Sequence, residues 1–421
     1  MIILEFKAYG KKHQYYAIDE AIRTVKFIRN SCIRLWMDNK GTGKYDLSKY
    51  CKVLAKQFPF AKELNSTARQ AAAERAWSSI RQSRRYANAR FYDNCKKKVP
   101  GKKGFPKFQK NCRSVEYKQS GWKLSPDKKS FAKRRLCRIL FSDKKGIGKL
   151  KLKGTWDLWH FDKKQIKRVR IVRRAYGYYV QFCISVDINE ELKPADANVG
   201  LDVGLKYFYT DSRGNVEPNP RFYRTVEKRL KFYQRRVSRK KKGSANRRKA
   251  INKLGRTHLK ISRQREEHAK RLARCVIRSR SVGFAESNDL VAYEDLRVKN
   301  LVKNHCLAKS INDAGWYQFR KWLEHFGEKF GRVTVPVNPA YTSQNCSQCG
   351  EVVKKSLSTR THVCKCGCQL DRDHNAAINI LQRALGTVGH TGTWIIDPNA
   401  YGDLASTLLG SDQVEQVEST K

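Results

Sequence analysis

The sequence predicts a multidomain protein that joins an α+β part to an α/β part. Apolar residues recur every three or four positions within 17–98, as in helices, and every second position in short segments of 114–187, as in strands. Strand and helix patterns alternate from residue 196 onward, which is typical of helices packed on one mixed sheet. Five cysteines gather between 346 and 368, as in a small metal-stabilised ribbon.

The amino-terminal part combines a strand with a helical block and further short strands. The first ten residues have a strand pattern, and helix patterns cover residues 18–35 and 64–92. Basic segments punctuated by Gly and Pro then lead into alternating segments that read as hairpins. We expect a small β-barrel or sheet formed by 1–16 and 99–195, with the helical domain 17–98 inserted after its first strand.

The carboxyl-terminal part begins with the strand "VGLDVGL" (199–205), which a turn and a second strand follow. A pair of long basic helices is expected at 222–239 and 246–281. The apolar strand "LVAYE" (290–294), an aromatic helix, another strand and a last helix near Asp371 complete the pattern.

These elements indicate the domain boundaries of the carboxyl-terminal part. One domain comprises residues 196–340 and 370–385, and a ribbon, 341–369, is inserted into it. Residues 386–421 are acidic and lack periodicity, so we expect a disordered tail.

Charge indicates the class of partner. The chain has 89 Lys and Arg against 38 Asp and Glu, a formal net charge of +51, and such a chain repels itself unless a polyanion neutralises it. Aromatic residues, 11% of the chain, are interleaved with the basic ones, which suits stacking on bases. The composition therefore predicts nucleic-acid binding, ahead of ribosome association or an anionic membrane surface.

The candidate contacts lie on one face of the 64–92 helix, in the loop near 100–110, and between the two basic helices. A solvated face is the alternative explanation for these charges, but their single sign favours contacts with phosphates. The candidates are Arg69, Arg81, Arg84, Arg85, Lys103, Lys107, Arg239, Lys240, Lys241, Arg247 and Arg248.

The first residues, "MIILEFKAYG", do not resemble a signal peptide, and no stretch approaches the roughly 18 apolar residues of a membrane helix. We expect an intracellular protein with reduced cysteines that has no membrane partner.

The clustered cysteines predict a zinc ribbon. Cys346 and Cys349 form one pair, and the second pair is either Cys364 with Cys366 or Cys366 with Cys368. Because Gly367 would supply the positive φ that a turn needs just after a last ligand at Cys366, we interpret Cys346, Cys349, Cys364 and Cys366 as the ligands. A closed site with four thiolates is structural.

Three acids form a second candidate metal site. Asp373 shares a stripe with the apolar residues of the last helix, whereas Asp371 is placed to cap that helix. Asp202 interrupts the first strand of the domain, and Glu294, with Asp295 as the alternative, ends a later strand. Each acid alone is more often a cap or a surface residue. Together they would hold two Mg²⁺ ions for phosphodiester hydrolysis.

Several segments are similar to one family in an ordered set. They are "GKKGFPKF" (101–108), "GLDVGLKYF" (200–208), "SRKKKGSANRRKA" (238–250), "YEDL" (293–296), "SINDAGWYQF" (310–319), "YTSQNCSQCG" (341–350) and "DRDHNAAINI" (371–380). They resemble the TnpB family of transposon-encoded, RNA-guided DNA endonucleases, which is related to the compact type V CRISPR effectors. The resemblance covers most of residues 100–384.

The resemblance implies a bilobed fold. A wedge-type β-barrel of the oligonucleotide-binding type would be interrupted by the helical recognition domain, and a RuvC-like (RNase H-like) nuclease domain would contain the zinc ribbon. By motif position, Asp202, Glu294 and Asp373 would be the catalytic acids. The family's second knuckle usually has two residues between its cysteines, whereas one separates Cys364 from Cys366, so Cys368 or His362 are substitutes for the fourth ligand.

The implied activity is Mg²⁺-dependent cleavage of DNA paired to a guide RNA, next to a short transposon-adjacent motif. The implied partners are a guide RNA and the target DNA, bound as an RNA–DNA heteroduplex by a protein monomer in the prokaryotic cytoplasm, associated with the nucleoid. Two alternatives remain. A guide-free RuvC-like resolvase or transposase would not need the basic amino-terminal half, and a non-catalytic zinc-ribbon RNA-binding protein would not need three inward acids.

Overall fold

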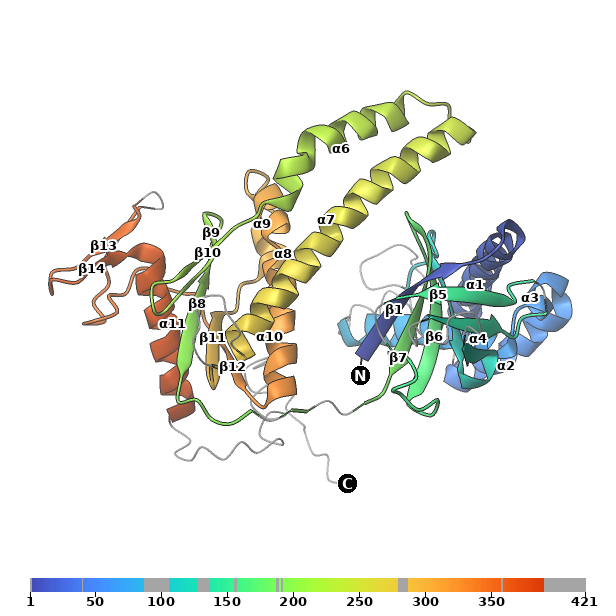
Figure 1. Ribbon diagram of the computed structural model, residues 1–421, viewed down its shortest axis with the longest axis horizontal. Helices are drawn as coiled ribbons and strands as arrows, with labels where there is room; N and C mark the ends of the chain where they lie inside the picture. The colour runs from blue at the N-terminus through green and yellow to red at the C-terminus, as the bar shows by residue number, and fades with distance from the viewer. Residues whose placement is uncertain are drawn as a thin grey trace, which may run out of the picture. The chain divides into compact units, whose positions relative to one another are not determined.

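The computed structural model describes residues 2–39, 41–86, 106–126, 136–144, 146–154, 157–186, 189–190, 192–278, 287–356 and 359–389. The chain divides into two compact units, Met1–Asp187 and Ile188–Lys421. Each unit has its own buried apolar cluster (Figure 1).

The first unit contains a seven-stranded antiparallel sheet in the order β2-β6-β7-β1-β5-β4-β3. Its strands are β1 (Ile2–Tyr9), β2 (Ser114–Lys118), β3 (Trp122–Pro126), β4 (Leu136–Phe141), β5 (Lys149–Lys153), β6 (Ile166–Arg174) and β7 (Gly177–Ile184).

The two edge strands of this sheet, β2 and β3, are joined by the three-residue 3₁₀ turn Gln119–Gly121. Because such a turn advances only about 2 Å per residue, the sheet has to curl until its edges approach each other. No ladder joins β2 to β3 in the described part of the sheet. The sheet is therefore a half-barrel, and the closed barrel that we expected is not formed by the described residues.

Four helices lie between β1 and β2 in the chain: α1 (Lys12–Asp38), α2 (Lys44–Gln57), α3 (Pro59–Glu63) and α4 (Ser66–Tyr86). Ile18, Val25 and Ile28 of α1 are buried in one cluster with the sheet residues Phe6 and Phe182. The apolar stripe predicted for the first helix is thus the face that covers the sheet. The expected helix over 64–92 corresponds to α4 as far as Tyr86, and its last residues lie outside the described ones.

The second unit contains a five-stranded mixed sheet in the order β10-β9-β8-β11-β12 and a separate two-stranded ladder. Strands β8, β11 and β12 are parallel, and the β8-β9-β10 hairpins are antiparallel. The strands are β8 (Asn198–Val203), β9 (Tyr207–Asp211), β10 (Val216–Pro218), β11 (Leu290–Glu294), β12 (Val333–Val337), β13 (Thr361–Val363) and β14 (Gln369–Asp371).

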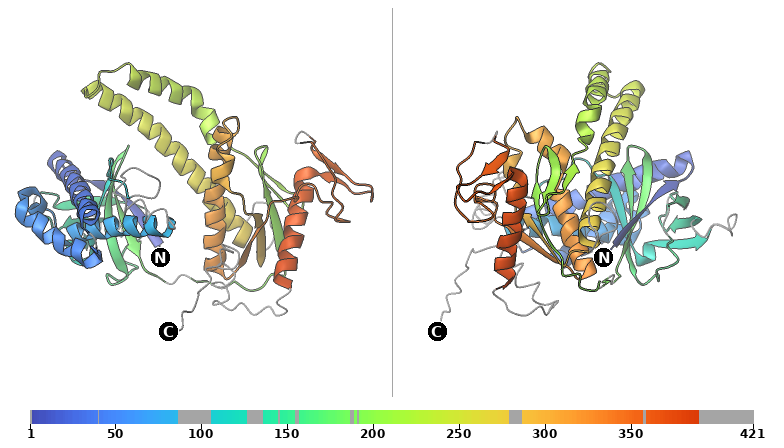
Figure 2. Two further views of the ribbon diagram at one scale, coloured as in Figure 1. Left: turned by 180° about the vertical axis from the view of Figure 1, so that it is seen from behind. Right: turned by 60° about the vertical axis from the view of Figure 1, so that its left-hand side comes forward.

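Helices cover both faces of the mixed sheet, with α11 on one face and α7 and α10 on the other (Figures 1 and 2). Helices α6 and α7 form a long hairpin that projects from the unit (Figure 1). The helices are α6 (Phe222–Ser238), α7 (Ala245–Arg278), α8 (Val298–Leu301), α9 (Ala308–Ala314), α10 (Trp316–Phe330) and α11 (Arg372–Gly389).

The last helix, α11, continues to Gly389, so residues 386–389 of the expected disordered tail (386–421) are helical instead; residues 390–421 lie outside the described residues. Within the part of the chain that the structure describes, none of the helices has both the length and the apolar character needed to cross a bilayer.

The two faces of the sheet can be told apart along β11. Leu290 and Ala292 pack in the cluster that contains α11 residues, whereas Val291 and Tyr293 pack in the cluster that contains α7 and α10 residues. Since side chains alternate along a strand, the position of any β8 or β11 residue fixes which helices it faces.

Gly200 lets α11 approach β8 very closely. A Cβ atom at this position would lie 2.2 Å from the Ala377 carbonyl oxygen and 2.8 Å from the Leu381 backbone nitrogen. Both neighbours are backbone atoms of one helix, so they cannot give way without moving the helix. The crossing of β8 and α11 therefore requires glycine at this position.

We predict that Gly200→Ala lowers the free energy of unfolding of the second unit by at least the 1–3 kcal/mol or so that is typical of overpacking. Urea unfolding monitored by circular dichroism measures this. The matched control is Gly386→Ala on α11, where no atom lies within 4 Å of the added Cβ. It should stabilise the helix slightly, since alanine is favoured over glycine there. Equal midpoints for Gly200→Ala and the unchanged chain would contradict the close approach.

Candidate active site

Asp202 and Glu294 end two neighbouring parallel strands. The β8–β11 ladder ends where Leu201 pairs with Tyr293, and the next residue on each strand is Asp202 or Glu294. The two acids thus lie side by side, at the roughly 4.8 Å separation of paired strands. Asp202 is two residues beyond Gly200 and Glu294 is two beyond Ala292, so both carboxylates belong to the face that α11 covers.

Asp373 comes to the same edge from the first turn of α11. The Asp371 carboxylate accepts hydrogen bonds from the backbone N–H of Asp373 at 2.8 Å and of His374 at 3.4 Å, so Asp371 caps the helix. Asp373 lies one helical turn before Ala377, which crosses β8 at Gly200. The tight crossing therefore carries Asp373 toward Asp202.

The position of the three acids has an electrostatic consequence for Asp202 and Glu294. Burial raises the pKa of Asp202 well above its usual range, and the charges of Glu294 and then Asp373 raise it further. Burial also raises the pKa of Glu294, although a hydrogen bond from Thr342 and the charge of Arg383 oppose this rise. The charges of Glu294 and Asp373 make ionisation of Asp202 less favourable, and a bound cation would compensate for this.

Positive and hydroxyl groups surround the cluster. Asp373 Oδ1 lies 3.0 Å from an Arg372 guanidinium nitrogen, and its Oδ2 lies 3.4 Å from Arg360 Nη1. The Thr342 hydroxyl donates a hydrogen bond of 2.6 Å to Glu294 Oε1. Sequence reasoning missed Thr342, Arg360 and Arg372, because nothing in their spacing connects them to acids on other elements.

Asp295, the alternative to Glu294, lies on the opposite face of β11. Its carboxylate forms an ion pair with Arg320 of α10, and Arg320 also binds Glu324 at 2.8 Å. Asp295 is thus separated from the other acids and held in an ion-pair network.

The structure also brings together four of the five clustered cysteines. The ligand atoms of Cys346, Cys349, Cys364 and Cys366 all lie within 4.8 Å of one another. Cys346 Sγ is 3.6 Å from Cys366 Sγ, and Cys349 Sγ is 3.6 Å from Cys364 Sγ. Zn–S bonds of about 2.3 Å in a tetrahedron place two sulfurs about 3.8 Å apart, so this set fits a zinc ion.

The turns of the ribbon have the geometry that two metal-binding knuckles need. Gly350 follows Cys349 with φ of 78°, and Gly367 follows Cys366 with φ of 90°, both in the left-handed region. The N–H of Gly350 donates to the Cys346 carbonyl at 2.9 Å, and the N–H of Gly367 donates to the Cys364 carbonyl at 3.1 Å. The positive φ predicted for Gly367 is confirmed.

Two buried asparagines of α11 hold the ribbon against the helix. Asn375 accepts from the Ser347 N–H at 3.0 Å and donates to the Asn345 carbonyl at 2.8 Å. Asn379 donates to the carbonyls of Thr342 at 2.8 Å and Asn345 at 2.7 Å. Sequence reasoning missed this pair, although two asparagines four residues apart on an apolar helix are a signal, since asparagine disfavours helix interiors.

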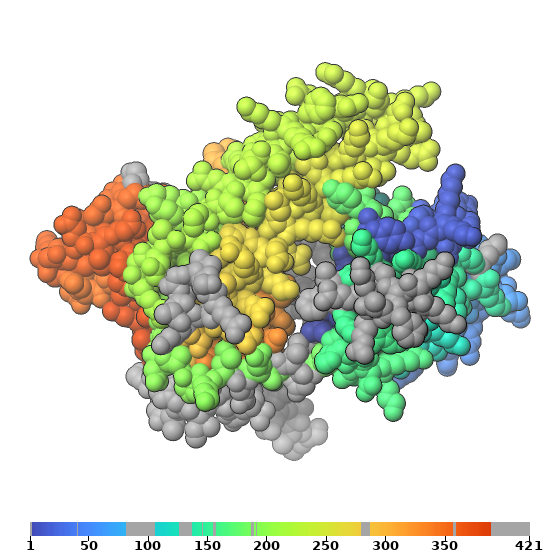
Figure 3. All heavy atoms as spheres, viewed as in Figure 1, coloured from blue at the N-terminus to red at the C-terminus, as the bar shows by residue number. Residues whose placement is uncertain are grey.

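The candidate nucleic-acid contacts lie in both units. Arg239, Lys240, Lys241 and Arg248 are exposed at the tip of the α6–α7 hairpin, whereas Arg247 is half-buried and donates to the Lys240 carbonyl at 2.9 Å. The hairpin projects from the surface of its own unit (Figure 3).

In the first unit, Arg69 Nη1 donates to the carbonyls of Ala61, Lys62 and Leu64 at 2.9, 3.3 and 2.9 Å, so part of this guanidinium is committed to a structural contact. Arg69 also lines a cavity of about 550 Å³. The basic residues of that cavity are Lys52, Lys56, Lys62, Arg69 and Lys144.

The remaining candidates in the first unit are only partly described. Lys107 is exposed. Lys103 lies outside the described residues, as do the side chains of Arg81, Arg84 and Arg85.

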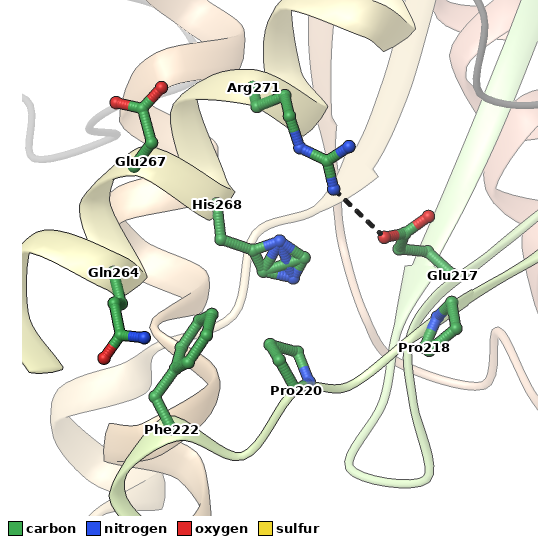
Figure 4. A pocket seen from close by; sticks show the side chains of 8 residues that line it. All are labelled: Glu217, Pro218, Pro220, Phe222, Gln264, Glu267, His268 and Arg271. Atoms are coloured by element: carbon green, nitrogen blue, oxygen red, sulfur yellow. Dashed lines mark ion pairs between the residues drawn. The ribbon is translucent and has the colours of Figure 1, made fainter.

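A cavity of about 430 Å³ lies where α7 faces the segment after β10 (Figure 4). Burial lowers the pKa of His268 in this cavity to about 4, and burial raises the pKa of Glu217. Arg271 lies 3.9 Å from Glu217. The lining does not include the three acids, so the cavity is separate from the carboxylate cluster.

Family models match two segments of the chain. Residues 181–305 match a family described as "Probable transposase", and residues 316–380 match "Cas12f1-like, TNB domain". The first segment contains Asp202 and Glu294, and the second contains the ribbon and Asp373.

Curated relatives have names that agree with these models. A "Putative RNA-guided DNA endonuclease" of Streptomyces pristinaespiralis is 39% identical over 207 residues, which is 48% of this chain and 50% of that protein. The "Putative RNA-guided DNA endonuclease InsQ" of Escherichia coli (strain K12) is 28% identical over 236 residues, which is 51% of this chain and 56% of that protein. The match thus spans about half the length of each relative.

One solved structure shows the same fold. The effector in "Cryo-EM structure of the Cas12f1-sgRNA-target DNA complex" aligns with a TM-score of 0.50 and 16% identity, over 88% of this chain and 83% of that chain. The resemblance that the sequence motifs indicate is confirmed: parts of the chain are similar to a transposase family, to the Cas12f1-like TNB domain and to proteins named as TnpB-like or RNA-guided DNA endonucleases.

Proposed function

We propose that the chain is an RNA-guided DNA endonuclease that cleaves DNA paired to a guide RNA, next to a short recognised motif. The observation that carries the proposal is the convergence of Asp202, Glu294 and Asp373 at one edge of the mixed sheet. Two strand ends and a helix that crosses at Gly200 supply them, as a RuvC-like nuclease would require.

The carboxylate cluster fits Mg²⁺. Its donors are hard oxygens, and burial, followed by the charges of the neighbouring acids, raises the pKa of Asp202, so a divalent cation would relieve an existing cost. Asp202, Glu294 and Asp373 would hold the metal, with two ions as the expected number. Bound Mg²⁺ would activate water and stabilise the leaving oxygen in phosphodiester hydrolysis.

The domains follow from this assignment. Residues 196–340 and 370–385 would form the RuvC-like nuclease domain, with 341–369 as its zinc-binding insert. Residues 1–16 and 99–195 would form the wedge domain, and 17–98 the recognition helices. The half-barrel and its inserted helices support this division.

The nucleic-acid contacts would be mainly to phosphates. The hairpin tip presents Arg239, Lys240, Lys241 and Arg248 to solvent, and Phe232 of α6 is 49% exposed beside Arg236, whose guanidinium lies 5.6 Å from its ring. Exposed charge together with an aromatic ring suits a backbone with neighbouring bases.

We predict that changing any one of Asp202, Glu294 or Asp373 to Ala abolishes cleavage while DNA binding persists. The loss of a direct metal ligand should exceed the roughly 10–100-fold loss that follows removal of a group behind a ligand. Since the acids act as one unit, a double variant should be no worse than a single one. Gel assays of cleavage and binding with the same guide-loaded protein measure both effects.

Two neighbouring acids supply the controls for this prediction. The first control is Asp295→Asn, because Asp295 lies on the opposite face of β11. The second is Asp371→Ser, which keeps a capping side chain at the start of α11. Both should retain substantial activity. An active Asp202→Ala variant would refute the RuvC-like assignment.

Guide dependence separates this function from its guide-free alternatives. We predict that ribonuclease treatment of the purified protein eliminates site-specific cleavage, and that adding back the copurified RNA restores it. Cleavage that is unchanged after complete RNA removal would indicate a resolvase or transposase.

We predict that replacing Lys240, Lys241 and Arg248 together with Gln weakens DNA binding and flattens its dependence on salt. Each lost phosphate contact should reduce the log–log slope by about 0.9 for duplex DNA. Fluorescence anisotropy across a salt series measures the slope. The charge-conserving variant Lys240→Arg, Lys241→Arg and Arg248→Lys should keep it. An unaltered slope in the glutamine variant would show that these charges only contact solvent.

A further inference from the structure

The ribbon holds more potential metal ligands than one zinc ion can use. Four cysteines complete one tetrahedral set, which leaves Cys368 and His362 beside it. Both are buried: Cys368 is 3% exposed and His362 is 0% exposed. A spare thiol alone could be a packed apolar side chain, so the imidazole is the more informative of the two.

Cys346, His362 and Cys368 form a second cluster. One ligand atom from each lies within 4.8 Å of the other two, and all three residues are buried. The short ladder of β13 and β14 fixes the positions of His362 and Cys368, because His362 pairs with Leu370 and the Cys364 N–H donates to the Cys368 carbonyl at 2.9 Å. Cys346 belongs to both clusters, and its thiolate is therefore placed between two potential ions.

One ring nitrogen of His362 has no hydrogen-bond partner among the described residues. Its Nε2 is buried and makes no hydrogen bond with any residue that the structure describes, and its Nδ1 contacts Lys355 Nζ. A buried polar atom without a partner is unfavourable, and the exceptions often mark an ion or a water. The imidazole thus has an unused lone pair or N–H inside a thiol-rich cluster.

We propose that the ribbon binds two zinc ions that share the Cys346 thiolate. The first ion would use Cys346, Cys349, Cys364 and Cys366. The second would use Cys346, Cys368 and one imidazole nitrogen of His362, and a non-protein ligand would complete its coordination. Thiolate and imidazole together favour zinc over magnesium or calcium.

Binding of the second ion consumes no oxidant or reductant. The Cys368 thiol loses its proton to solvent as the Zn–S bond forms, and the imidazole binds in its neutral form. The irregular spacing of the second knuckle fits this arrangement. The left-handed turn at Gly367, with φ of 90°, lies between Cys366 and Cys368, so these two thiols can be directed to different ions.

Zinc stoichiometry tests the proposal. Full-length protein purified without chelators should contain two zinc ions per chain by elemental analysis. Cys368→Ser and His362→Ala should each contain one. The matched control is Cys306→Ser, which removes an exposed thiol of the same unit that lies 3.5 Å from His305 Nε2. It should keep two.

Zinc release from the unchanged chain provides a second test that does not depend on whether the variants fold. Under chelator competition, one equivalent of zinc should leave before the other, because the second ion has only three protein ligands. One zinc per chain, released in a single phase, would overturn the second site. The inference rests on the proposed zinc site of four cysteines, and a chain without zinc would defeat that site as well. The two failures are therefore distinguishable.

Discussion

The main constraint on the second unit is the electrostatic repulsion between three carboxylates, those of Asp202, Glu294 and Asp373, which the fold brings to one edge of a sheet. Burial raises the pKa of Asp202 and of Glu294, and the charges of Glu294 and Asp373 raise that of Asp202 further, so their convergence opposes folding unless other interactions enforce it. Parallel pairing of β8 and β11 enforces one contact, and the close crossing at Gly200 enforces the other. Arg372 and Arg360 offset part of the repulsion at Asp373.

Hydrogen bonds connect the ribbon, which contains the clustered cysteines, to these carboxylates. Among the described residues, only Val353 and Leu370 are partly buried apolar residues packed against its cysteines, so this part of the segment has little core of its own. Such small modules take most of their folding free energy from zinc. Because Thr342 binds Glu294 and Asn379 binds the Thr342 carbonyl, order in the ribbon is transmitted to the carboxylate on β11 and to the helix that carries Asp373.

The periodicity of the sequence predicted which faces of the strands and helices are buried. Contacts between distant segments determine the features that the periodicity could not show. Alternation in "VGLDVGL" placed Asp202 opposite the buried Val199 and Leu201, and the helical stripe through Ala377 and Ile380 is fully buried. No local pattern could show that the edges of the first sheet approach through a three-residue turn, or that Arg69 binds three carbonyls. The pattern of charges in the sequence indicates whether a surface is basic or acidic. Only the folded structure shows which guanidinium groups already donate hydrogen bonds to the protein itself.

The electrostatics of the chain divide into long-range and local parts. A net charge of +51 attracts a polyanion to the whole surface, but at physiological salt each exposed charge acts over only about 8 Å. The field of the three acids is therefore confined to the edge of one sheet, where it repels phosphates unless cations intervene. Affinity for nucleic acid can then come from exposed basic surfaces such as the α6–α7 tip, while the partly buried carboxylates remain available for a divalent ion. Under the proposed function, this arrangement would link close approach of a phosphate backbone to the presence of a cation at the three acids.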